Sequence, residues 1–465
     1  MPGSRLEEIY YELPVWLQNG IFSLYGLKLA RIRYSPPFFA MLQSLKESEW
    51  WSHERIREHQ NERISNVVRT AYHTIPFYRR WFDEHAIDVE AVRTTADLQQ
   101  LPILSKQMVR EHAREMISSA FAKRTLTQGL TSGTTGTPLT IYQTREGAAF
   151  QWAIWWRHKA RFGLKVGDRH LVFGARVPVS QRQSGPPYWR HDLFNKRVYL
   201  STYHISPSTV GAIVDYLNTT HFDFFTGYPS AMYALAVLME EAGLRLTNRP
   251  KYIVAGADAL THEFESSIRH GFGVPVTEQY GMAEFAGNMS KCEAGKFHLD
   301  FECCHLEQQP IPGADEQYKL IFTGWGNPAM PFIRYEVGDV GSAASDACAC
   351  GRASICLDRI DGRLEDFVVT PDGRKVIGMN QVLEYACNAK MIQLYQRDAD
   401  AVELRVVPGA GFGEQDEKAL VRELQRRVGP RMAISIRLVD QFTLSPTGKF
   451  RAVISELDRE GDGRL

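Results

Sequence analysis

Apolar residues recur at helical spacing up to about residue 110, which predicts a helical N-terminal part. In residues 61–85 this spacing continues until Pro76, where we expect a helix to be interrupted. Residues 13–34 form another amphipathic stretch, and such a helix either packs on the domain surface or lies on a membrane. We favour packing on the domain surface, so membrane contact is not expected.

Between residues 206 and 281, short apolar strands alternate with helices. Strands are predicted at 222–227, 251–257 and 274–281. Ser206 and Pro207 resemble an N-cap and a first helical residue, Gly243 ends a second helix, and Thr261 caps a third. This alternation predicts βαβ units in a parallel sheet, and ligands of such sheets bind beyond the carboxyl ends of the strands.

The character of the sequence changes near residue 360, where charged and turn-forming residues become frequent. We predict a hairpin at TPDGRK (370–375), a strand at 401–408 and a helix at 417–429. About 100 residues of this kind suffice for a small domain. The predicted fold class is α/β, with a large domain containing parallel sheets over residues 1–360 and a small, mobile α+β domain over residues 361–465.

The composition is that of an ordinary globular protein, with 44% hydrophobic and 23% charged residues. Lys and Arg number 54, as do Asp and Glu, so no overall basic field favours nucleic acid as a partner. No apolar run approaches the roughly 20 residues of a spanning helix, and no signal-peptide pattern opens the chain. The chain has seven cysteines, and the lack of a signal-peptide pattern favours a reducing cytoplasmic location over a disulfide framework.

The stretch TSGTTGTP, residues 131–138, offers hydroxyl groups and bare backbone but has little to bury. Its two glycines permit close approach by another group, and backbone N–H groups with hydroxyls form a nest for anions. No Gly-Lys-Ser/Thr sequence follows, so the stretch is not a Walker A loop. Taken alone, a flexible linker explains it nearly as well as a phosphate-binding loop.

Four further motifs follow this stretch in order along the chain. They are QYGMAE (279–284), YEVGDVG (335–341), DGRLEDF (361–367) and SPTGKFR (445–451). Together with LTSGTTGTP, the set resembles the motifs of the adenylate-forming enzymes, which include acyl-CoA synthetases, peptide-synthetase adenylation domains and luciferases. IPFYRRWF, LPILSK and TGYPSAMYALA are similar to the phenylacetate–CoA ligase-like branch, which includes relatives in capsular polysaccharide biosynthesis.

The resemblance implies that a carboxylate attacks the α-phosphorus of ATP, giving acyl-AMP and pyrophosphate. Lys449 would reach the α-phosphate and the carboxylate, Glu284 would coordinate Mg²⁺, and Asp339 would bind the ribose hydroxyls. Tyr280 would lie against the adenine, and Arg363 would reach the ribose or a phosphate. Thr131, counted among the catalytic residues, would hold the β- and γ-phosphates together with Ser132, Gly133, Thr134, Thr135 and Gly136. The nucleotide and acyl pockets would be lined by Gly256, Ala257, Asp258 and Gly281.

After adenylation, a second half-reaction transfers the acyl group to an acceptor, and the resemblance leaves the identity of this acceptor open. Related enzymes commonly have Asp two residues after the Gly-Arg pair of the hinge, where this chain has Glu365, so the hinge lies there or at Asp366. CoA thiol is the first expectation for the acceptor. The alternatives are an amine, which gives an amide, and a hydroxyl that receives AMP. A nucleotide-binding scaffold without activity is disfavoured by the presence of Glu284, Asp339 and Lys449.

A second candidate site consists of the soft ligands Cys292, His298, Cys348 and Cys350. They are compatible with tetrahedral Zn²⁺, although Cys-x-Cys is tighter than the usual Cys-x2-Cys spacing. CACGR (348–352) is also similar to a pattern in phenylacetate–CoA ligase-like proteins. We therefore predict a structural zinc cluster, with Cys303, Cys304 and His305 as competing ligands and buried reduced thiols as the alternative.

The acid is not specified by the sequence. Aromatic residues at 152–156 and 224–228 either line a pocket for an aromatic or aliphatic acid or belong to the core. The prediction is thus a cytoplasmic ligase that uses ATP, Mg²⁺ and a small carboxylic acid, with CoA as the expected acceptor.

Overall fold

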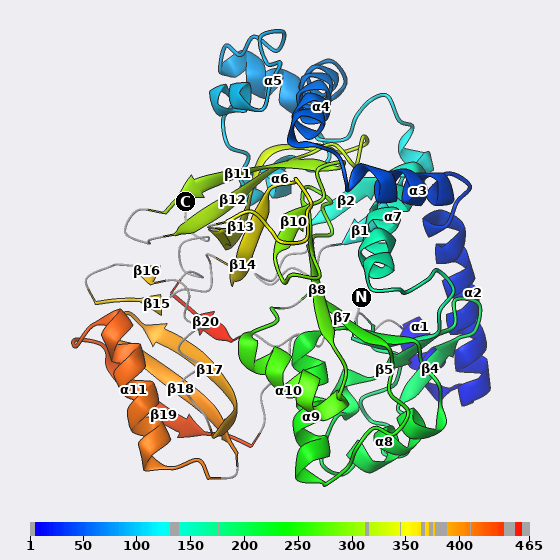
Figure 1. The fold of residues 1–465 in the computed structure, drawn as a ribbon, viewed down its shortest axis with the longest axis vertical. Coiled ribbons are helices and arrows are strands. Elements are labelled where there is room, and N and C mark those ends of the chain that lie inside the picture. The colour runs from blue at the N-terminus through cyan, green and yellow to red at the C-terminus, as the bar shows by residue number, and fades with distance from the viewer. Residues whose placement is uncertain are drawn as a thin grey trace.

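A computed structural model gives the fold of the chain (Figure 1). The residues that it describes are 5–130, 139–174, 176–257, 259–311, 316–344, 346–363, 368–371, 375–376, 388–409, 411–440 and 452–457.

The N-terminal part is helical, as predicted. Helices α1 to α6 span Arg5–Glu12, Val15–Arg33, Pro37–Ser48, His53–Thr74, Pro76–Glu84 and Lys106–His112. The short 3-10 helices η1 and η2 span Ala96–Gln100 and Lys123–Thr125. Ile75 is extended with φ −118° and ψ 112°, because a residue before proline disfavours the helical region. The predicted interruption at Pro76 is therefore confirmed.

Among the described residues, twelve strands form one sheet through the centre of the large part of the molecule (Figure 1). They are β3 (His170–Phe173), β4 (Trp189–Asp192), β5 (Arg197–Leu200), β6 (Phe224–Gly227), β7 (Tyr252–Gly256), β8 (Val276–Gly281), β9 (Asn288–Lys291), β10 (Phe297–Leu299), β11 (Cys304–Pro310), β12 (Gln317–Gly324), β13 (Phe332–Ala343) and β14 (Cys356–Arg363). Their order is β11-β12-β13-β14-β10-β9-β8-β7-β6-β3-β5-β4. Strands β8, β7, β6, β3 and β5 pair in parallel, and the other pairings are antiparallel.

Both faces of the parallel strands are buried. The helices of this region are α7 (Arg145–Arg161), η3 (Thr202–His204), α8 (Val210–Thr219), α9 (Pro229–Glu241) and α10 (His262–Phe272). Phe225 and Ile253 pack with α8, α9 and α10, whereas Phe224 and Val254 belong to the cluster that contains α7. Since successive side chains of a strand point to opposite faces, the continuous apolar strands read from the sequence are explained.

The helix boundaries follow local signals in two of three cases. Thr261 Oγ1 accepts a hydrogen bond from Phe264 N at 3.2 Å, and Gly243 has φ 64° just after α9, so both predicted helix ends are confirmed. The predicted helix start at Ser206–Pro207 is wrong, because α8 begins at Val210. Thr209 Oγ1 accepts from Ser206 N at 3.2 Å, which fixes a turn ahead of the helix.

The last part of the chain has a sheet and a hydrophobic cluster of its own. The hairpin β15 (Val368–Val369) and β16 (Lys375–Val376) precedes a four-stranded sheet in the order β19-β18-β17-β20. These strands span Ala433–Leu438, Ala401–Pro408, Ala389–Asp398 and Val453–Ser455, and helix α11 spans Glu414–Val428. Leu394, Leu404 and Leu420 lie in its core. The division into domains at residues 360 and 361 stays a prediction.

Candidate active site

The parallel strands β7 and β8 end at the same edge of the sheet, at Gly256 and Gly281. A Cβ atom added to Gly256, at the end of β7, would lie 2.9 Å from Gln279 O. One added to Gly281, at the end of β8, would lie 2.6 Å from Asn288 Oδ1. Ala257 directly follows β7, and Phe285 lies four residues after β8. They have φ of 67° and 53°, a region of backbone conformation that residues other than glycine rarely adopt. Strained backbone of this kind is concentrated at functional sites.

Tyr280 and Asp339 come from distant strands and meet at this edge. The Tyr280 hydroxyl donates to Asp339 Oδ2 at 2.5 Å. The ring of Tyr280 stacks at 6.2 Å on Phe322 of β12, which holds the phenol in place. Asp339 of β13 pairs with Arg363 of β14 in the sheet, so the two residues predicted to contact the ribose lie on neighbouring strands.

Glu284 follows β8 and is buried, with 8% of its surface exposed. The Tyr335 hydroxyl donates to its Oε1 at 3.4 Å. Among the described side chains, no Lys, Arg or His lies within ion-pair distance of this carboxylate. A buried carboxylate without a cationic partner is costly, so these surroundings fit a bound cation such as Mg²⁺.

The hydroxyl-rich stretch is fixed at its base. Strands β1 (Thr127–Leu130) and β2 (Thr140–Gln143) form an antiparallel hairpin in which Leu130 is opposite Thr140. Residues 131–136 themselves lie outside the described residues, as do Asp258, Lys449 and the side chain of Arg363. The hairpin nevertheless determines where the stretch begins and ends.

Side-chain amides join this hairpin to the QYGMAE segment. Gln143 Nε2 donates to Gln151 Oε1 at 3.3 Å, and Gln151 Nε2 donates to Met282 O at 3.3 Å. On the other side, Asn327 Nδ2 donates to Tyr142 O at 2.9 Å. The base of the stretch therefore lies beside the segment that carries Glu284.

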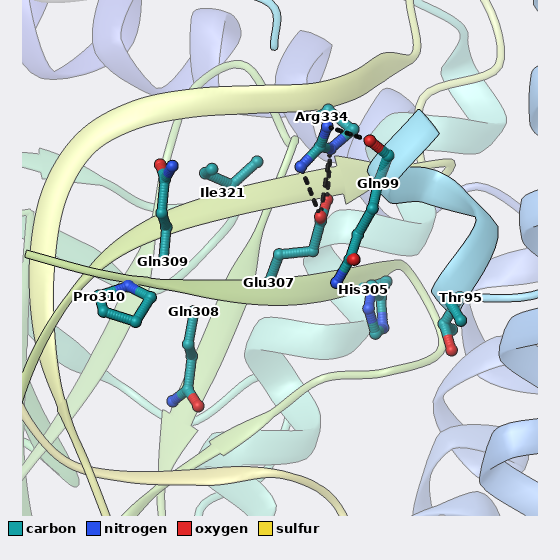
Figure 2. Close-up of a pocket in the computed structure, with 10 residues that line it drawn as sticks. Thr95, Gln99, His305, Glu307, Gln308, Gln309, Pro310, Ile321 and Arg334 are labelled. Carbon is teal, nitrogen blue, oxygen red and sulfur yellow. Dashed lines mark hydrogen bonds and ion pairs between the residues drawn. The ribbon is translucent and has the colours of Figure 1, made fainter. Parts of the chain in front are cut away.

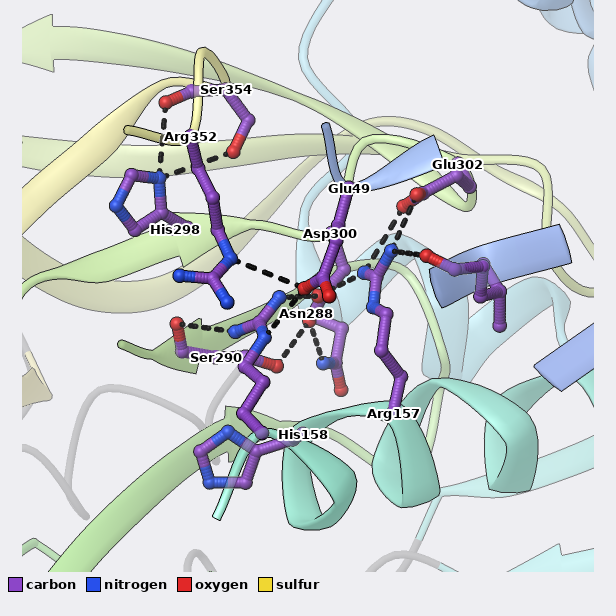
Figure 3. A network of polar contacts seen from close by, with 12 residues as sticks. Glu49, Arg157, His158, Asn288, Ser290, His298, Asp300, Glu302, Arg352 and Ser354 are labelled. Atoms are coloured by element: carbon purple, nitrogen blue, oxygen red, sulfur yellow. Dashed lines mark hydrogen bonds and ion pairs between the residues drawn. The ribbon is translucent and has the colours of Figure 1, made fainter. Parts of the chain in front are cut away.

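A buried charge network that was not predicted from the sequence forms hydrogen bonds to residues of β8 and β9 (Figure 3). Arg157 of α7 forms ion pairs of 2.5 Å with both Asp300 and Glu302. Burial alone would lower the pKa of Arg157, but these two carboxylates outweigh it and raise the pKa. Ser290 Oγ donates to Asp300 at 2.7 Å, and Gln279 Nε2 donates to Ser290 Oγ at 3.1 Å. The network thus reaches the residue that precedes Tyr280.

The same network extends to the cysteine cluster. Glu49 accepts from Arg161 Nε at 2.9 Å and from Arg352 Nε at 3.1 Å. Arg352 also pairs with Glu293 at 2.7 Å, and it follows Cys350 by two residues. Helix α7, the end of α3 and the loop before β14 are therefore joined through buried charges (Figure 3).

The four predicted zinc ligands converge. Their ligand atoms all lie within 4.8 Å of one another, with 3.5 Å between Cys292 Sγ and Cys348 Sγ and 3.2 Å between Cys350 Sγ and His298 Nε2. A tetrahedral zinc site has ligand atoms about 3.5–3.8 Å apart. His298 Nδ1 lies 3.2 Å from Ser354 Oγ, a partner that fixes the ring and leaves Nε2 toward the cluster.

The competing ligands lie elsewhere. Cys303 and Cys304 are fully buried, 3.7 Å apart, and Cys303 Sγ donates to Asp300 O at 3.1 Å. Burial raises the pKa of Cys303 well above its ordinary value, as expected for a structural thiol. His305 lines a separate cavity, described below.

That cavity, of about 530 Å³, lies between η1 and β11 (Figure 2). Its wall includes Arg334, which holds Glu307 through bonds of 2.8–3.1 Å and also donates to backbone oxygens near η1. Of the residues singled out in the sequence, the competing ligand His305 lines it. Arg334 and Glu307 satisfy one another, whereas His305 Nδ1 and Gln308 Nε2 are buried without a hydrogen-bond partner among the described residues.

The aromatic residues considered for an acid pocket belong mainly to the core. Trp156, Phe224 and Phe225 are buried in the two large hydrophobic clusters. Trp155 instead donates through Nε1 to Asn288 Oδ1 at 3.1 Å, beside Gly281. Of this group, Trp155 and Tyr228, which directly follows β6, lie at the carboxyl ends of the strands.

Comparisons with known proteins give consistent likenesses. The model of the CapK C-terminal domain matches residues 368–456. The chain is 23% identical over 457 residues to Protein CapK of Staphylococcus aureus, covering 97% of this chain and 100% of CapK. It is 26% identical over 353 residues to the phenylacetate-coenzyme A ligase of Thermus thermophilus, covering 70% of this chain and 74% of that ligase.

A solved structure with a similar fold is 2-hydroxyisobutyryl-CoA ligase in the postadenylation state, in complex with R3-HIB-AMP. The TM-score is 0.68 at 17% sequence identity, over 88% of this chain and 91% of that chain. At this level of identity the likeness establishes the fold, and it confirms the predicted fold class.

Proposed function

We propose that this chain, a relative of CapK and the phenylacetate-coenzyme A ligases, is an ATP-dependent ligase that adenylates a carboxylic acid and passes the acyl group to CoA. The predicted resemblance to the phenylacetate–CoA ligase-like branch of the adenylate-forming enzymes is confirmed by these likenesses. The observation that carries the proposal is the convergence of Tyr280, Asp339 and Glu284 at one sheet edge, beside the base of the hydroxyl-rich stretch.

In the proposed reaction, two anions must approach each other before the new bond forms. The substrate carboxylate oxygen attacks the α-phosphorus of ATP, and the bond from that phosphorus to the pyrophosphate oxygen breaks. Positioning and charge neutralisation therefore dominate the catalysis. Asp339 would accept hydrogen bonds from the ribose, and the Tyr280 ring would lie along the adenine. Residues 131–136 would enclose the terminal phosphates.

Glu284 is the group that would hold Mg²⁺, a hard cation that prefers carboxylate and phosphate oxygens. Its burial without a cationic partner among the described side chains supports this role. In the second half-reaction the CoA sulfur would attack the acyl carbon, and AMP would leave with the electrons of the carbon–oxygen bond.

The proposal is tested by pyrophosphate release in the presence of ATP, Mg²⁺ and a panel of aromatic and aliphatic acids. We expect acid-dependent release, an acyl-hydroxamate when hydroxylamine is present, and a thioester when CoA is present. Hydroxamate without thioester would contradict CoA as the acceptor and indicate an amine or hydroxyl. Absence of pyrophosphate with every acid, together with no ATP binding by calorimetry, would contradict adenylation itself.

We further propose that Cys292, His298, Cys348 and Cys350 hold one structural zinc ion. The distances among their ligand atoms and the second contact of the His298 ring support a tetrahedral site. The cluster joins the β9–β10 hairpin to the loop before β14, so a bound ion would fix that loop.

Purified protein should contain about one zinc per chain. Cys350→Ser should lose most of that metal and lower the melting temperature, because three ligands hold the ion less tightly than four. The matched control is Cys356→Ser, which removes a partly buried thiol outside the cluster and should keep the zinc. Elemental analysis and a thermal scan with and without chelator measure both effects. Equal metal content in the two variants would contradict the site.

A further inference from the structure

Helix α2 packs on the large part of the molecule through polar as well as apolar side chains. Its fully buried residues are Gln18, Ser23 and Gly26. Gln18 Oε1 accepts from Arg190 Nε at 2.6 Å, and Ser23 Oγ accepts from Leu193 N at 3.0 Å. The Phe22 ring packs on the same side, 5.3 Å from the ring of Tyr199, so the buried side mixes polar and apolar residues.

Gly26 shows how closely this buried side approaches the sheet. A Cβ atom at Gly26 would lie 2.2 Å from Asp192 Oδ2, at the end of β4. Asn19 adds a further bond, accepting from His191 N at 2.9 Å. The orientation of α2 is therefore fixed by several specific contacts along one edge strand.

Helix α2 lies at the outer edge of the molecule (Figure 1), and large apolar side chains on its other half are exposed. Trp16 and Leu24 are 70% and 65% exposed, and Ile21 and Tyr25 are also exposed. At 100° per residue these four positions span one half of the helix, with Leu24 near its middle. The turn after β4 adds Leu193 and Phe194, exposed by 68% and 59%, and Leu193 lies against Ser23. We call these six residues the α2 face.

The charge around the α2 face has one sign along most of its length. From residue 13 to 46 the chain has no Asp or Glu, but it has Lys28, Arg31, Arg33 and Lys46. Lys28 and Arg31 are exposed on the same half of α2, between Leu24 and the C-terminal end. Lys196 is exposed beside Phe194, and the Arg176 guanidinium lies 4.6 Å from the Tyr25 ring. The nearest acids in sequence, Glu12 and Glu47, lie beyond the two ends of this segment.

Buried cations beneath the end of α2 strengthen this positive field. Arg33 and Arg197 both lie over the Trp152 ring, at 4.1 and 5.2 Å. Among the described residues, no carboxylate is within ion-pair distance of these two side chains. Burial and the neighbouring Arg197 lower the pKa of Arg33 to about 10, so it remains charged at neutral pH.

We propose that the α2 face docks on an anionic lipid surface, independently of the proposed ligase activity. Apolar and aromatic side chains flanked by cations are the composition of a helix that lies in a membrane interface. A second copy of the chain is a poorer occupant, because a symmetric contact would bury Lys28 and Arg31 against a patch without carboxylates. Among the described residues no helix is long and apolar enough to cross a bilayer, so contact through this face would be peripheral.

Co-sedimentation with vesicles of phosphatidylcholine, with and without phosphatidylglycerol, tests the proposal. The full-length protein should bind the vesicles that contain phosphatidylglycerol, and salt should weaken binding. Leu24→Glu should lower the partition coefficient about tenfold or more, since it places a carboxylate in the centre of the apolar face. Lys28→Glu and Arg31→Glu should each lower it about fivefold or more, and only with the anionic lipid.

The matched control is Leu438→Glu, which adds the same charge at an exposed apolar position of β19, away from α2. It should bind as the unmodified protein does. Lack of binding by the unmodified protein, or equal binding by Leu24→Glu, would overturn the proposal. A different result would also overturn it. If light scattering showed a dimer that Leu24→Glu dissociates, and the unmodified protein did not bind vesicles, the α2 face would be the contact with a second copy of the chain. All four substitutions are at exposed sites, and unchanged melting temperatures would verify their folding.

Discussion

Lys449→Ala should slow formation of acyl-AMP by about 100- to 1000-fold, the usual effect of removing one group that stabilises developing charge. Lys449 stands in SPTGKFR, which the resemblance places over the α-phosphate during adenylation. Its ammonium group would neutralise both the attacking carboxylate and the phosphate oxygens, so alanine would leave two anions facing each other. Acid-dependent pyrophosphate release under saturating ATP measures the effect.

A half-reaction assay makes this prediction specific. In adenylate-forming enzymes the small domain rotates after adenylation and removes this lysine from the site. Lys449→Ala should therefore still convert synthetic acyl-AMP and CoA to thioester at nearly the normal rate. The control is Lys418→Ala, on the exposed side of α11, where Lys418 pairs with Glu414 at 2.6 Å. Full adenylation activity in Lys449→Ala would falsify the assignment.

The second large effect is on stability. Arg157→Met should lower the free energy of unfolding by about 3–5 kcal/mol, because it leaves Asp300 and Glu302 buried without their cation. Methionine keeps most of the volume and the apolar stem, so the loss reports on charge rather than on a cavity. The difference in denaturation midpoint between the two proteins measures it.

Two comparisons isolate the cause. Arg80→Met removes an exposed guanidinium that pairs with Glu115 at 2.7 Å, and should cost less than about 1 kcal/mol. Combining Arg157→Met with Asp300→Asn and Glu302→Gln should recover part of the loss, because the uncompensated charges disappear together. If the Arg157→Met protein were as stable as the Arg80→Met protein, the buried charge network would contribute little to the free energy of unfolding.

Local sequence signals predicted the elements that carry the site. The short apolar runs ending in Gly256 and Gly281 form parallel neighbours, and Thr261 caps the helix between them. The four soft ligands were predicted from their residue types together with the similarity of CACGR to phenylacetate–CoA ligase-like proteins, and they lie together. These signals work because cap hydroxyls, turn glycines and strand periodicity act over a few residues, where the sequence itself supplies the neighbour.

Long-range polar pairing was not predictable in the same way. Arg157 is separated from Asp300 by 143 residues, and no local pattern links a guanidinium in an aromatic helix to one particular carboxylate. The start of α8 was missed for a local reason, since Thr209 Oγ1 accepts from Ser206 N and fixes a turn ahead of the helix. Charged residues inside apolar segments, such as Arg157 between Trp156 and His158, were the available signal.

The orientation of α2 illustrates a further limit. An amphipathic pattern defines two sides of a helix but not which side meets the protein. Here specific bonds from Gln18, Asn19 and Ser23 to an edge strand determine the choice. Packing on the domain surface was predicted, but the packed side mixes polar residues with Phe22, while Trp16 and Leu24 stay exposed.

Strand β14 sets a fixed spacing between the two chemical centres of the molecule. It begins at Cys356, opposite His298 of the cysteine cluster, and ends at Arg363, opposite Asp339. Six steps of β14, from Leu357 to Arg363, lie opposite only four steps of β13, so two bulges keep these ends closer than the roughly 23 Å of seven regular steps. Deleting one residue within the strand would turn every later side chain to the opposite face. Length variation among relatives that keep both centres should therefore fall in the loop before β14 and spare the strand, which would act as a molecular ruler.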